Sequence, residues 1–129
     1  MNPGSAGRWA ARLATTTIRR DLFIDGKFVP AVSGERFASV TPRDGTILAQ
    51  VAAGAAPDID RAVRSGVRAF ESGVWSAADP AQRKTVLLRL AELIEANRDE
   101  LALLESIDAG KPIGDTLAVD VPKLSLIHI

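Results

Sequence analysis

Residues 104–112 read Leu-Glu-Ser-Ile-Asp-Ala-Gly-Lys-Pro, and this stretch has the pattern of a helix that ends. A glycine favours the left-handed conformation that follows a helix, and a proline soon after it cannot continue the helix. Upstream, Asn97 followed by Glu100 resembles a capping box, the usual sign of a helix start. We therefore predict a helix that begins near Asn97 and ends at Gly110.

Asp108 breaks a local rule, because it lies in the last turn of this predicted helix, where the helix dipole disfavours an acid. One interpretation is functional: its carboxylate, beside the exposed carbonyls of the helix end, helps to hold a cation that prefers oxygen ligands. The other is structural: Asp108 accepts hydrogen bonds from the backbone around Gly110. Lys111 could be a catalytic amine, but its position before Pro112 favours a role in neutralising the helix end.

Two further helices are predicted upstream. Pro57 and Asp58 suit the start of the first, and Gly73 suits its end. Its apolar residues recur at helical spacing: Ile59, Ala62, Val63, Gly66, Val67 and Phe70. The second follows Pro80, with an apolar face made of Val86, Leu87, Leu90, Leu93 and Ile94. Because Phe70 lies on the apolar stripe, we expect Phe70 and Trp75 to be core residues rather than a platform for a ligand.

The first part of the chain has strand patterns. Residues 22–29 contain Asp25-Gly26 between two apolar runs, the strongest local signal for a hairpin with a type I′ turn. Strands are also predicted at residues 36–40 and 47–52. The expected fold is a small antiparallel β unit followed by three α-helices. Two short hairpins could hardly cover the apolar faces of three helices, so we interpret the chain as a subdomain of a larger fold.

Composition excludes several classes of function. The 129 residues fit one domain, and 16 basic and 16 acidic side chains cancel, which leaves no electrostatic footprint for a nucleic acid or an anionic membrane. No cysteine is present, so the chain can form neither a disulfide nor a thiol nucleophile. No glycine-rich phosphate loop is present. The single histidine, His128, is expected to be an exposed terminal side chain.

The segment before Asp21 contains four arginines and no acid. This composition is typical of a mitochondrial transit peptide. The alternation of apolar and basic residues favours a second interpretation, a short amphipathic helix around Trp9, Leu13 and Ile18 that docks on the rest of the fold.

From Asp21 to Pro122 the chain resembles the N-terminal part of the NAD(P)-dependent aldehyde dehydrogenases. The resemblance rests on the order and spacing of short motifs over about 100 residues rather than on any single one. The matching stretches are residues 22–26, 40–42, 44–45, 58–63, 69–70, 75, 83–84 and 105–112, with the leucines and alanine of residues 87–94. The leader, with Trp9 ahead of a short helix, is similar to the bacterial γ-glutamyl-γ-aminobutyraldehyde dehydrogenases.

The resemblance implies a parent protein of the α/β class with a Rossmann-type cofactor-binding domain. Residues 1–20 are then an N-terminal extension and residues 21–122 the N-terminal part of that domain. Residues 123–129 do not follow the family pattern, and Leu-Ser-Leu-Ile-His-Ile resembles a translated sequencing adapter. We interpret this tail as an artefact of truncation.

The resemblance also implies a chemistry. Members of the family oxidise an aldehyde to a carboxylic acid with NAD or NADP: a cysteine thiolate attacks the aldehyde, hydride passes to the nicotinamide, and a glutamate activates the water that hydrolyses the thioester. The cysteine, the glutamate, an oxyanion-hole asparagine and the cofactor-binding residues lie further along in family members. No catalytic or cofactor-binding residue can therefore be assigned here, and the chain alone is expected to be inactive.

One site can be carried over from the family. Its members often bind a structural Na+ or K+ through main-chain oxygens of the two residues before the Thr-Pro and through the acid of the helix-end motif. Here these are Ser39, Val40 and Asp108, and the resemblance favours the cation over the purely structural role of Asp108. The implied parent is cytoplasmic and homo-oligomeric, with an aldehyde as substrate and with neither a nucleic acid nor a membrane as partner.

Two other hypotheses differ in class. A truncated interaction module could associate with full-length aldehyde dehydrogenase subunits through its exposed apolar helix faces. An unrelated three-helix binding domain is the second, and the ordered motifs argue against it. In either case, a piece of a larger domain is expected to populate partly folded states or to aggregate when isolated.

Overall fold

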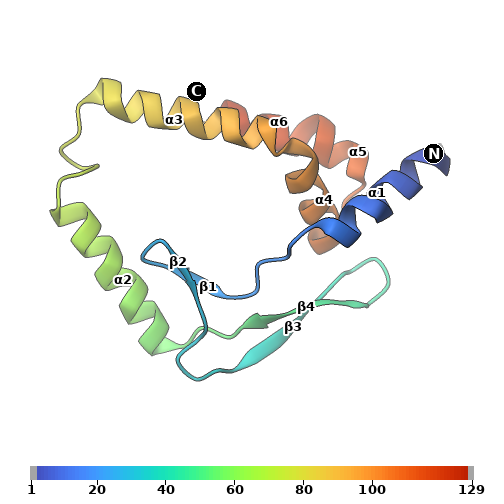
Figure 1. Ribbon diagram of the computed structural model, residues 1–129, viewed down its shortest axis with the longest axis horizontal. Helices are drawn as coiled ribbons and strands as arrows, with labels where there is room; N and C mark the ends of the chain where they lie inside the picture. Colours follow the sequence, from blue (N-terminus) through green and yellow to red (C-terminus); the bar gives the residue numbers. More distant parts are fainter. Residues whose placement is uncertain (1–2, 128–129) are drawn as a thin grey trace. The chain divides into compact units, whose positions relative to one another are not determined.

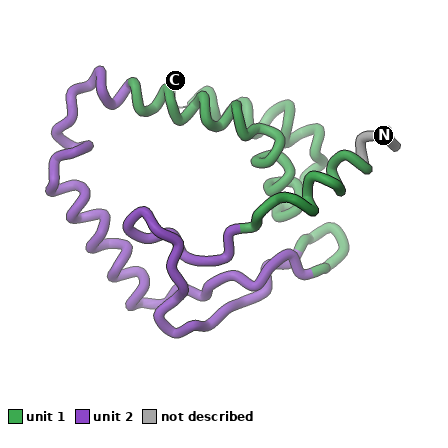
Figure 2. The backbone as a smooth tube through the Cα atoms, in the orientation of Figure 1, with its two compact units in different colours: residues 1–18, 41–46, 85–129 green, residues 19–40, 47–84 purple. Residues whose placement is uncertain are grey.

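The computed structural model describes residues 3–127, so the prediction for His128 lies outside the described residues. The chain divides into two compact units (Figure 2). One contains residues 19–40 and 47–84, and the other contains residues 1–18, 41–46 and 85–129. Within residues 3–127, no helix is long and apolar enough to cross a bilayer.

The first of these units contains two hairpins (Figure 1). In one, β1 (Leu22–Ile24) pairs antiparallel with β2 (Lys27–Val29); in the other, β3 (Arg36–Val40) pairs antiparallel with β4 (Ile47–Ala52). Asp25 and Gly26 both have positive φ, 56° and 74°, as a type I′ turn requires. The prediction of a small antiparallel β unit is confirmed, and it consists of two separate two-stranded sheets.

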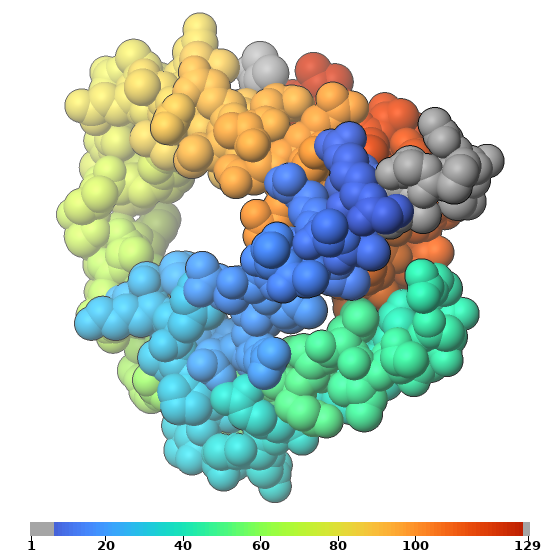
Figure 3. Space-filling view, turned by 45° about the vertical axis from the view of Figure 1, so that its right-hand side comes forward, coloured from blue at the N-terminus to red at the C-terminus, as the bar shows by residue number. Residues whose placement is uncertain are grey.

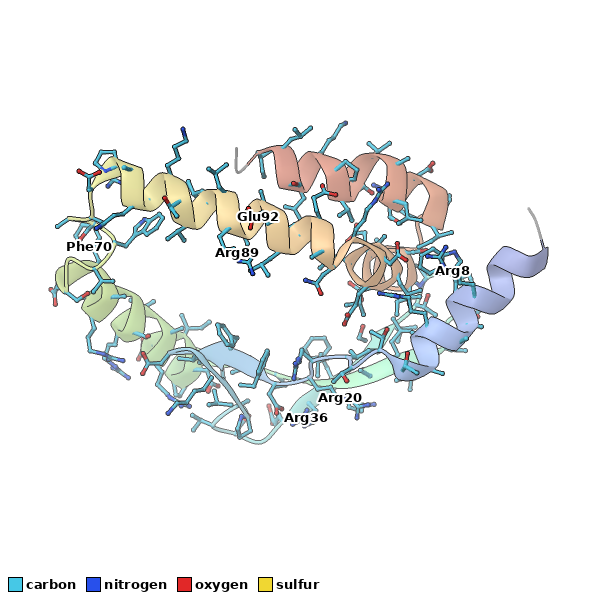
Figure 4. All side chains as sticks on the ribbon, turned by 45° about the horizontal axis from the view of Figure 1, so that its top comes forward. Arg8, Arg20, Arg36, Phe70, Arg89 and Glu92 are labelled. Atoms are coloured by element: carbon cyan, nitrogen blue, oxygen red, sulfur yellow. The ribbon has the colours of Figure 1, made fainter. Side chains whose placement is uncertain are left out.

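Arg36 holds the segment before β1 against the second hairpin. Its guanidinium forms an ion pair with Asp21 and donates hydrogen bonds to the carbonyls of Arg20 (3.4 Å) and Gln50 (3.1 Å), and Figure 4 labels Arg20 and Arg36 next to each other. The amide of Ala52 donates to the Arg20 carbonyl (2.8 Å). The short strands therefore gain hydrogen bonds beyond their own ladders.

The helix α2 (Ala56–Glu71) begins with Pro57 and Asp58 in its first turn, and the chain leaves it through Ser72 and Gly73, whose φ is 74°. Both ends agree with the prediction. Asp58 does more than face the helix dipole: its side chain is 2% exposed and accepts hydrogen bonds from the amides of Val32 (3.0 Å) and Ala55 (3.1 Å). It therefore ties the loop after β2 to the start of α2.

The second unit is helical. It contains α1 (Pro3–Thr15), most of α3 (Pro80–Ala96), α4 (Arg98–Ala109), α5 (Ile113–Asp115), the π-helical turn η1 (Thr116–Asp120) and α6 (Val121–Leu126). The helix α1 contacts α4, with an ion pair between Arg8 and Asp99, and Figure 3 shows α1 in blue beside the orange part of this unit. The predicted helix around Trp9 and Leu13 is thus present, and Ile18 lies beyond its end.

The core of the helical unit is small. Ile94, Ala102 and Val121 are buried, and Leu101, Ile113 and Leu117 pack partly buried against them. Thr116 is fully buried, and its hydroxyl lies 3.1 Å from the carbonyl of Ala102 and 3.0 Å from that of Ile113, so the polar group is satisfied inside the core. The sequence pattern predicts no element in residues 113–126, yet these turns supply half of this core.

Two local predictions are wrong. Asn97 does not form a capping box for α4: its side-chain amide donates to the Leu93 carbonyl (2.8 Å), and no side-chain hydrogen bond caps α4. The reason is that α3 ends at Ala96, so Asn97 is shared by two helix ends and satisfies the carbonyls of the first. Phe70 and Trp75 are not core residues, because they are 71% and 46% exposed.

Candidate functional site

The best candidate for a functional site is the end of α4 with the loop that packs against it in the helical unit. Gly110 ends α4 with φ 74° and ψ 12°, and its amide donates to the carbonyl of Ser106 (3.1 Å). The hydroxyl of Ser106 donates to the carbonyl of Lys111 (2.7 Å). Each polar group of this turn therefore fixes the next, as expected for a helix end that must hold one conformation.

The loop of residues 41–46 lies directly against this helix end. A β-carbon added to Gly110 would lie 2.7 Å from Cγ of Pro42, so the proline ring occupies the space that a side chain would need. Thr41 is buried, and its amide donates to the carbonyl of Thr46 (2.9 Å). The structure thus brings the Thr-Pro motif and the helix-end motif together within one unit.

Asp44 holds the loop in shape. Its carboxylate accepts hydrogen bonds from the amide (3.1 Å) and hydroxyl (2.7 Å) of Thr46. Those two bonds, with the guanidinium of Arg43 nearby, hold the pKa of Asp44 below its ordinary value of 3.8. The charged form of this carboxylate is therefore the one that the loop is built around.

Lys111 has a partner that its local sequence does not indicate. Its ammonium group pairs with Asp120 at 2.6 Å, and this hydrogen bond raises the pKa of Lys111 above its ordinary value of 10.5. A lysine held protonated is a poor nucleophile at neutral pH. The ion pair therefore does not favour the catalytic-amine interpretation, and it links the segment after α4 to η1.

A surface hollow of about 470 Å³ lies beside this ion pair. Its lining is mostly apolar and comes from α4, η1 and α6: Leu101, Glu105, Lys111, Asp120, Val121, Lys123, Leu124 and Ile127. Because Lys111 and Asp120 neutralise each other at its edge, they offer little net charge to a ligand.

Of the predicted cation ligands, Ser39 and Val40 end β3 and Asp108 lies in the last turn of α4, where its side chain is exposed. The ladder between β3 and β4 is irregular between Ser39 and Val40, where Ser39 faces Ala49 but Val40 faces Ile47. Such bulges redirect the backbone and are common beside functional sites. Among residues 3–127, no three Asp, Glu, His or Cys side chains gather closely enough to hold a metal ion.

The comparison with protein families identifies the chain. A model described as "Aldehyde dehydrogenase family" matches residues 28–127. The chain belongs to the aldehyde dehydrogenase family. This confirms the resemblance that the Glu105–Pro112 stretch and the upstream motifs indicated.

Individual aldehyde dehydrogenases match nearly the whole chain. The aminoacetaldehyde dehydrogenase of Pseudomonas aeruginosa is 49% identical over 119 residues, which are 92% of this chain and 24% of that protein. The NADP/NAD-dependent aldehyde dehydrogenase PuuC of Escherichia coli is 43% identical over 122 residues, 95% of this chain and 25% of that protein.

Solved aldehyde dehydrogenases share the fold. An indole-3-acetaldehyde dehydrogenase in its apo form superposes with a TM-score of 0.91 at 45% identity, over 95% of this chain and 28% of that chain. The γ-glutamyl-γ-aminobutyraldehyde dehydrogenase of Burkholderia cenocepacia gives 0.90 at 46% identity, over 93% of this chain and 24% of that chain. The chain therefore spans about a quarter of the length of these relatives.

Proposed function

We propose that residues 21–122 form the N-terminal part of the cofactor-binding domain of an enzyme that oxidises an aldehyde to a carboxylic acid with NAD or NADP. The observation that carries the proposal is the match of residues 28–127 to the family, with 49% identity to an aminoacetaldehyde dehydrogenase. Solved relatives in complex with NAD+ support the cofactor, and one of them also holds the ligand abbreviated IAA. We further propose that the enzyme is cytoplasmic and homo-oligomeric.

The role of this segment is structural rather than chemical. The oxidation needs a nucleophile that adds to the aldehyde and later leaves, and a thiolate suits both steps. The 129 residues contain no cysteine. We therefore expect the chain alone to bring no catalytic group to an aldehyde.

A chimera tests this function. Residues 21–122 replace the matching segment of the Pseudomonas aeruginosa aminoacetaldehyde dehydrogenase, and aldehyde-dependent formation of NADH is measured. We expect the chimera to retain activity within about tenfold of the parent enzyme, because surface and scaffold substitutions at near 50% identity rarely disturb a distant site. We expect none from the 129-residue chain. A soluble but inactive chimera, or an active isolated chain, would contradict the proposal.

We also propose that Asp108, with main-chain oxygens of Ser39 and Val40, holds a Na+ or K+ ion. The proposal rests on the resemblance of the Thr-Pro and helix-end motifs to those of family members that bind such an ion. Within the helical unit, Pro42 of the first motif contacts Gly110 of the second. A helix end presents carbonyl oxygens that lack intrahelical partners, and hard cations prefer such ligands.

If the cation binds, the thermal stability of the protein should depend on which cation is present and not on ionic strength. In the chimera, replacing choline chloride by KCl or NaCl at equal concentration should raise Tm by roughly 1–3 °C, because a ligand that binds only the folded state stabilises it. Asp108→Asn should abolish the difference. Glu105→Gln, which removes a charge one turn earlier on the same helix, should preserve it. Equal ion dependence in both variants would exclude Asp108 as a ligand.

A further inference from the structure

Residues 113–126 form one continuous helical run with a π turn in its middle. The run consists of α5, η1 and α6, which follow one another without a break (Figure 1). In η1 the amide of Val121 donates to the carbonyl of Thr116, five residues back, where an α-helix uses a spacing of four. The π turn therefore holds one more residue than an α-helical turn. Such turns are rare and occur mostly as single insertions into α-helices.

The buried positions show which residues this insertion places in the core. Thr116, Val121 and Ser125 are buried, at spacings of five and then four residues. In a regular α-helix each residue turns by about 100°, so residue 120 would lie above Thr116. That residue is Asp120, whose carboxylate would then face an apolar core. The extra residue instead turns Val121 inward and leaves Asp120 at the edge, where it pairs with Lys111 at 2.6 Å.

Pro122 explains where the π turn lies. A proline inside an α-helix has no amide hydrogen to donate, and its ring clashes with the carbonyl four residues back. Pro122 directly follows the last pair of residues that the π turn joins, in the first turn of α6. A π turn is wider than an α-helical turn, so it gives the ring room that a regular helix would not. The helical run therefore continues past a residue that normally breaks it.

Arg98 replaces the donor that Pro122 lacks. If the spacing of five continued beyond Val121, the amide of residue 122 would donate to the carbonyl of Leu117. In its place the guanidinium of Arg98 donates to that carbonyl at 2.7 Å. Because Arg98 is the first residue of α4, this bond also ties the π turn to the preceding helix.

We propose that Arg98, Pro122 and the extra residue of η1 form a conformational device, a register clamp that decides which side of residues 113–126 faces the core. Pro122 excludes the α-helical register, the extra residue places Val121 in the core, and Arg98 satisfies the carbonyl that is left over. All members of the clamp belong to the helical unit, so it acts whether or not the chain is part of an enzyme.

A one-residue deletion tests the register. Removing Ala118, an exposed residue of η1, reduces the spacing from Thr116 to Val121 to the four residues of an α-helix. Pro122 then lies four residues after Leu117, whose carbonyl its ring would meet. We expect the Tm of the 129-residue chain, followed by circular dichroism, to fall by roughly 5–10 °C. Adding Pro122→Ala to the deletion should bring Tm back to within about 2 °C of the unmodified chain.

A matched control separates this effect from the general cost of a deletion. Glu92 is an exposed residue of the regular helix α3. Its removal rotates the rest of that helix by about 100° and should lower Tm whether residue 122 is proline or alanine. Pro122→Ala alone should leave the π turn in place, because the buried spacing of Thr116 and Val121 still requires it.

A pair of variants tests Arg98. Arg98→Met keeps an unbranched side chain but removes the donor to the Leu117 carbonyl, and it should lower Tm by about 2–4 °C. In the Pro122→Ala background, the new amide of residue 122 can donate to that carbonyl instead. Arg98→Met should therefore change Tm by less than about 1 °C in that background.

Three results would overturn the register clamp. The first is a deletion of Ala118 that leaves Tm unchanged, and the second is a loss of Tm that is the same with proline and with alanine at position 122. The third is an equal effect of Arg98→Met in both backgrounds. Where a variant has no cooperative transition, hydrogen exchange at the Val121 amide decides: protection should be lost on deletion of Ala118 and regained with Pro122→Ala.

Discussion

Gly110→Ala should lower the free energy of unfolding of the helical unit by about 2–4 kcal/mol. Two independent costs add. An L-residue at φ 74° is strained by roughly 1–2 kcal/mol, and the new methyl carbon would lie 2.7 Å from Cγ of Pro42, far inside van der Waals contact. The backbone at this point is also held by the hydrogen bond that the Gly110 amide donates to the Ser106 carbonyl, so it cannot easily move away. Urea denaturation followed by circular dichroism measures the change.

Two further variants separate the strain from the clash. Gly114→Ala adds the same methyl group in α5, where φ is not positive and no atom lies within 4 Å, so it should be neutral or slightly stabilising. Pro42→Ala combined with Gly110→Ala should remove the clash but leave the backbone strain. The double variant should therefore regain roughly half of the lost free energy of unfolding. If Gly110→Ala and Gly114→Ala change the unfolding midpoint equally, the contact between the loop and the helix end does not constrain Gly110.

The helix end illustrates what local rules can and cannot predict. That Gly110 would end α4 follows from the sequence alone, because only its own φ is involved. That Pro42 also excludes a side chain there depends on the packing of two segments far apart in the chain. Asn97 is a case in which a local rule fails. Its position fits a helix start, but its side-chain amide donates to the Leu93 carbonyl at the end of the preceding helix.

The helix α2 illustrates a different limit. Periodicity predicts which residues share a face, and Ile59, Val63, Val67 and Phe70 do. It does not predict which face turns inward, because that depends on what the unit offers as a partner. Here α2 packs on the polar turn of the first hairpin, where Asp25 accepts a hydrogen bond from Ser65. The polar face of α2 therefore turns inward, and Phe70 is exposed.

In the candidate site, too, sequence motifs predict some features and tertiary packing decides the others. Resemblance named Ser39, Val40 and Asp108, and the structure adds a ladder irregularity at the first two and a fixed helix end at the third. The ion pair of Lys111 with Asp120 was not predictable, because Asp120 lies in turns to which the sequence pattern gave no element. Residues 113–126 carry few strong helix signals and form turns chiefly by packing on Ala102 and Ile94.

Asp58→Ala should cost about 2–4 kcal/mol of the free energy of unfolding, the largest effect expected in the β-containing unit. The carboxylate is 2% exposed and accepts from two backbone amides, so its loss leaves the N–H groups of Val32 and Ala55 without an acceptor. The bond from Ala55 is also the cap at the start of α2, so its loss counts once. Because both bonds are part-buried, each lost acceptor costs nearer the lower end of about 1–3 kcal/mol. Amide hydrogen exchange at Val32 and Ala55, with urea denaturation, measures the local and the global loss.

Asp60→Ala is the matched control, because it removes the same charge from the first turns of the same helix but from an exposed position. It should cost no more than about 0.5 kcal/mol, the usual range for a surface substitution. Asp58→Asn keeps an oxygen acceptor for one of the two amides and should fall between the two alanine variants. Equal losses in Asp58→Ala and Asp60→Ala would mean that charge near the helix dipole, and not the tie to the loop after β2, is what Asp58 contributes.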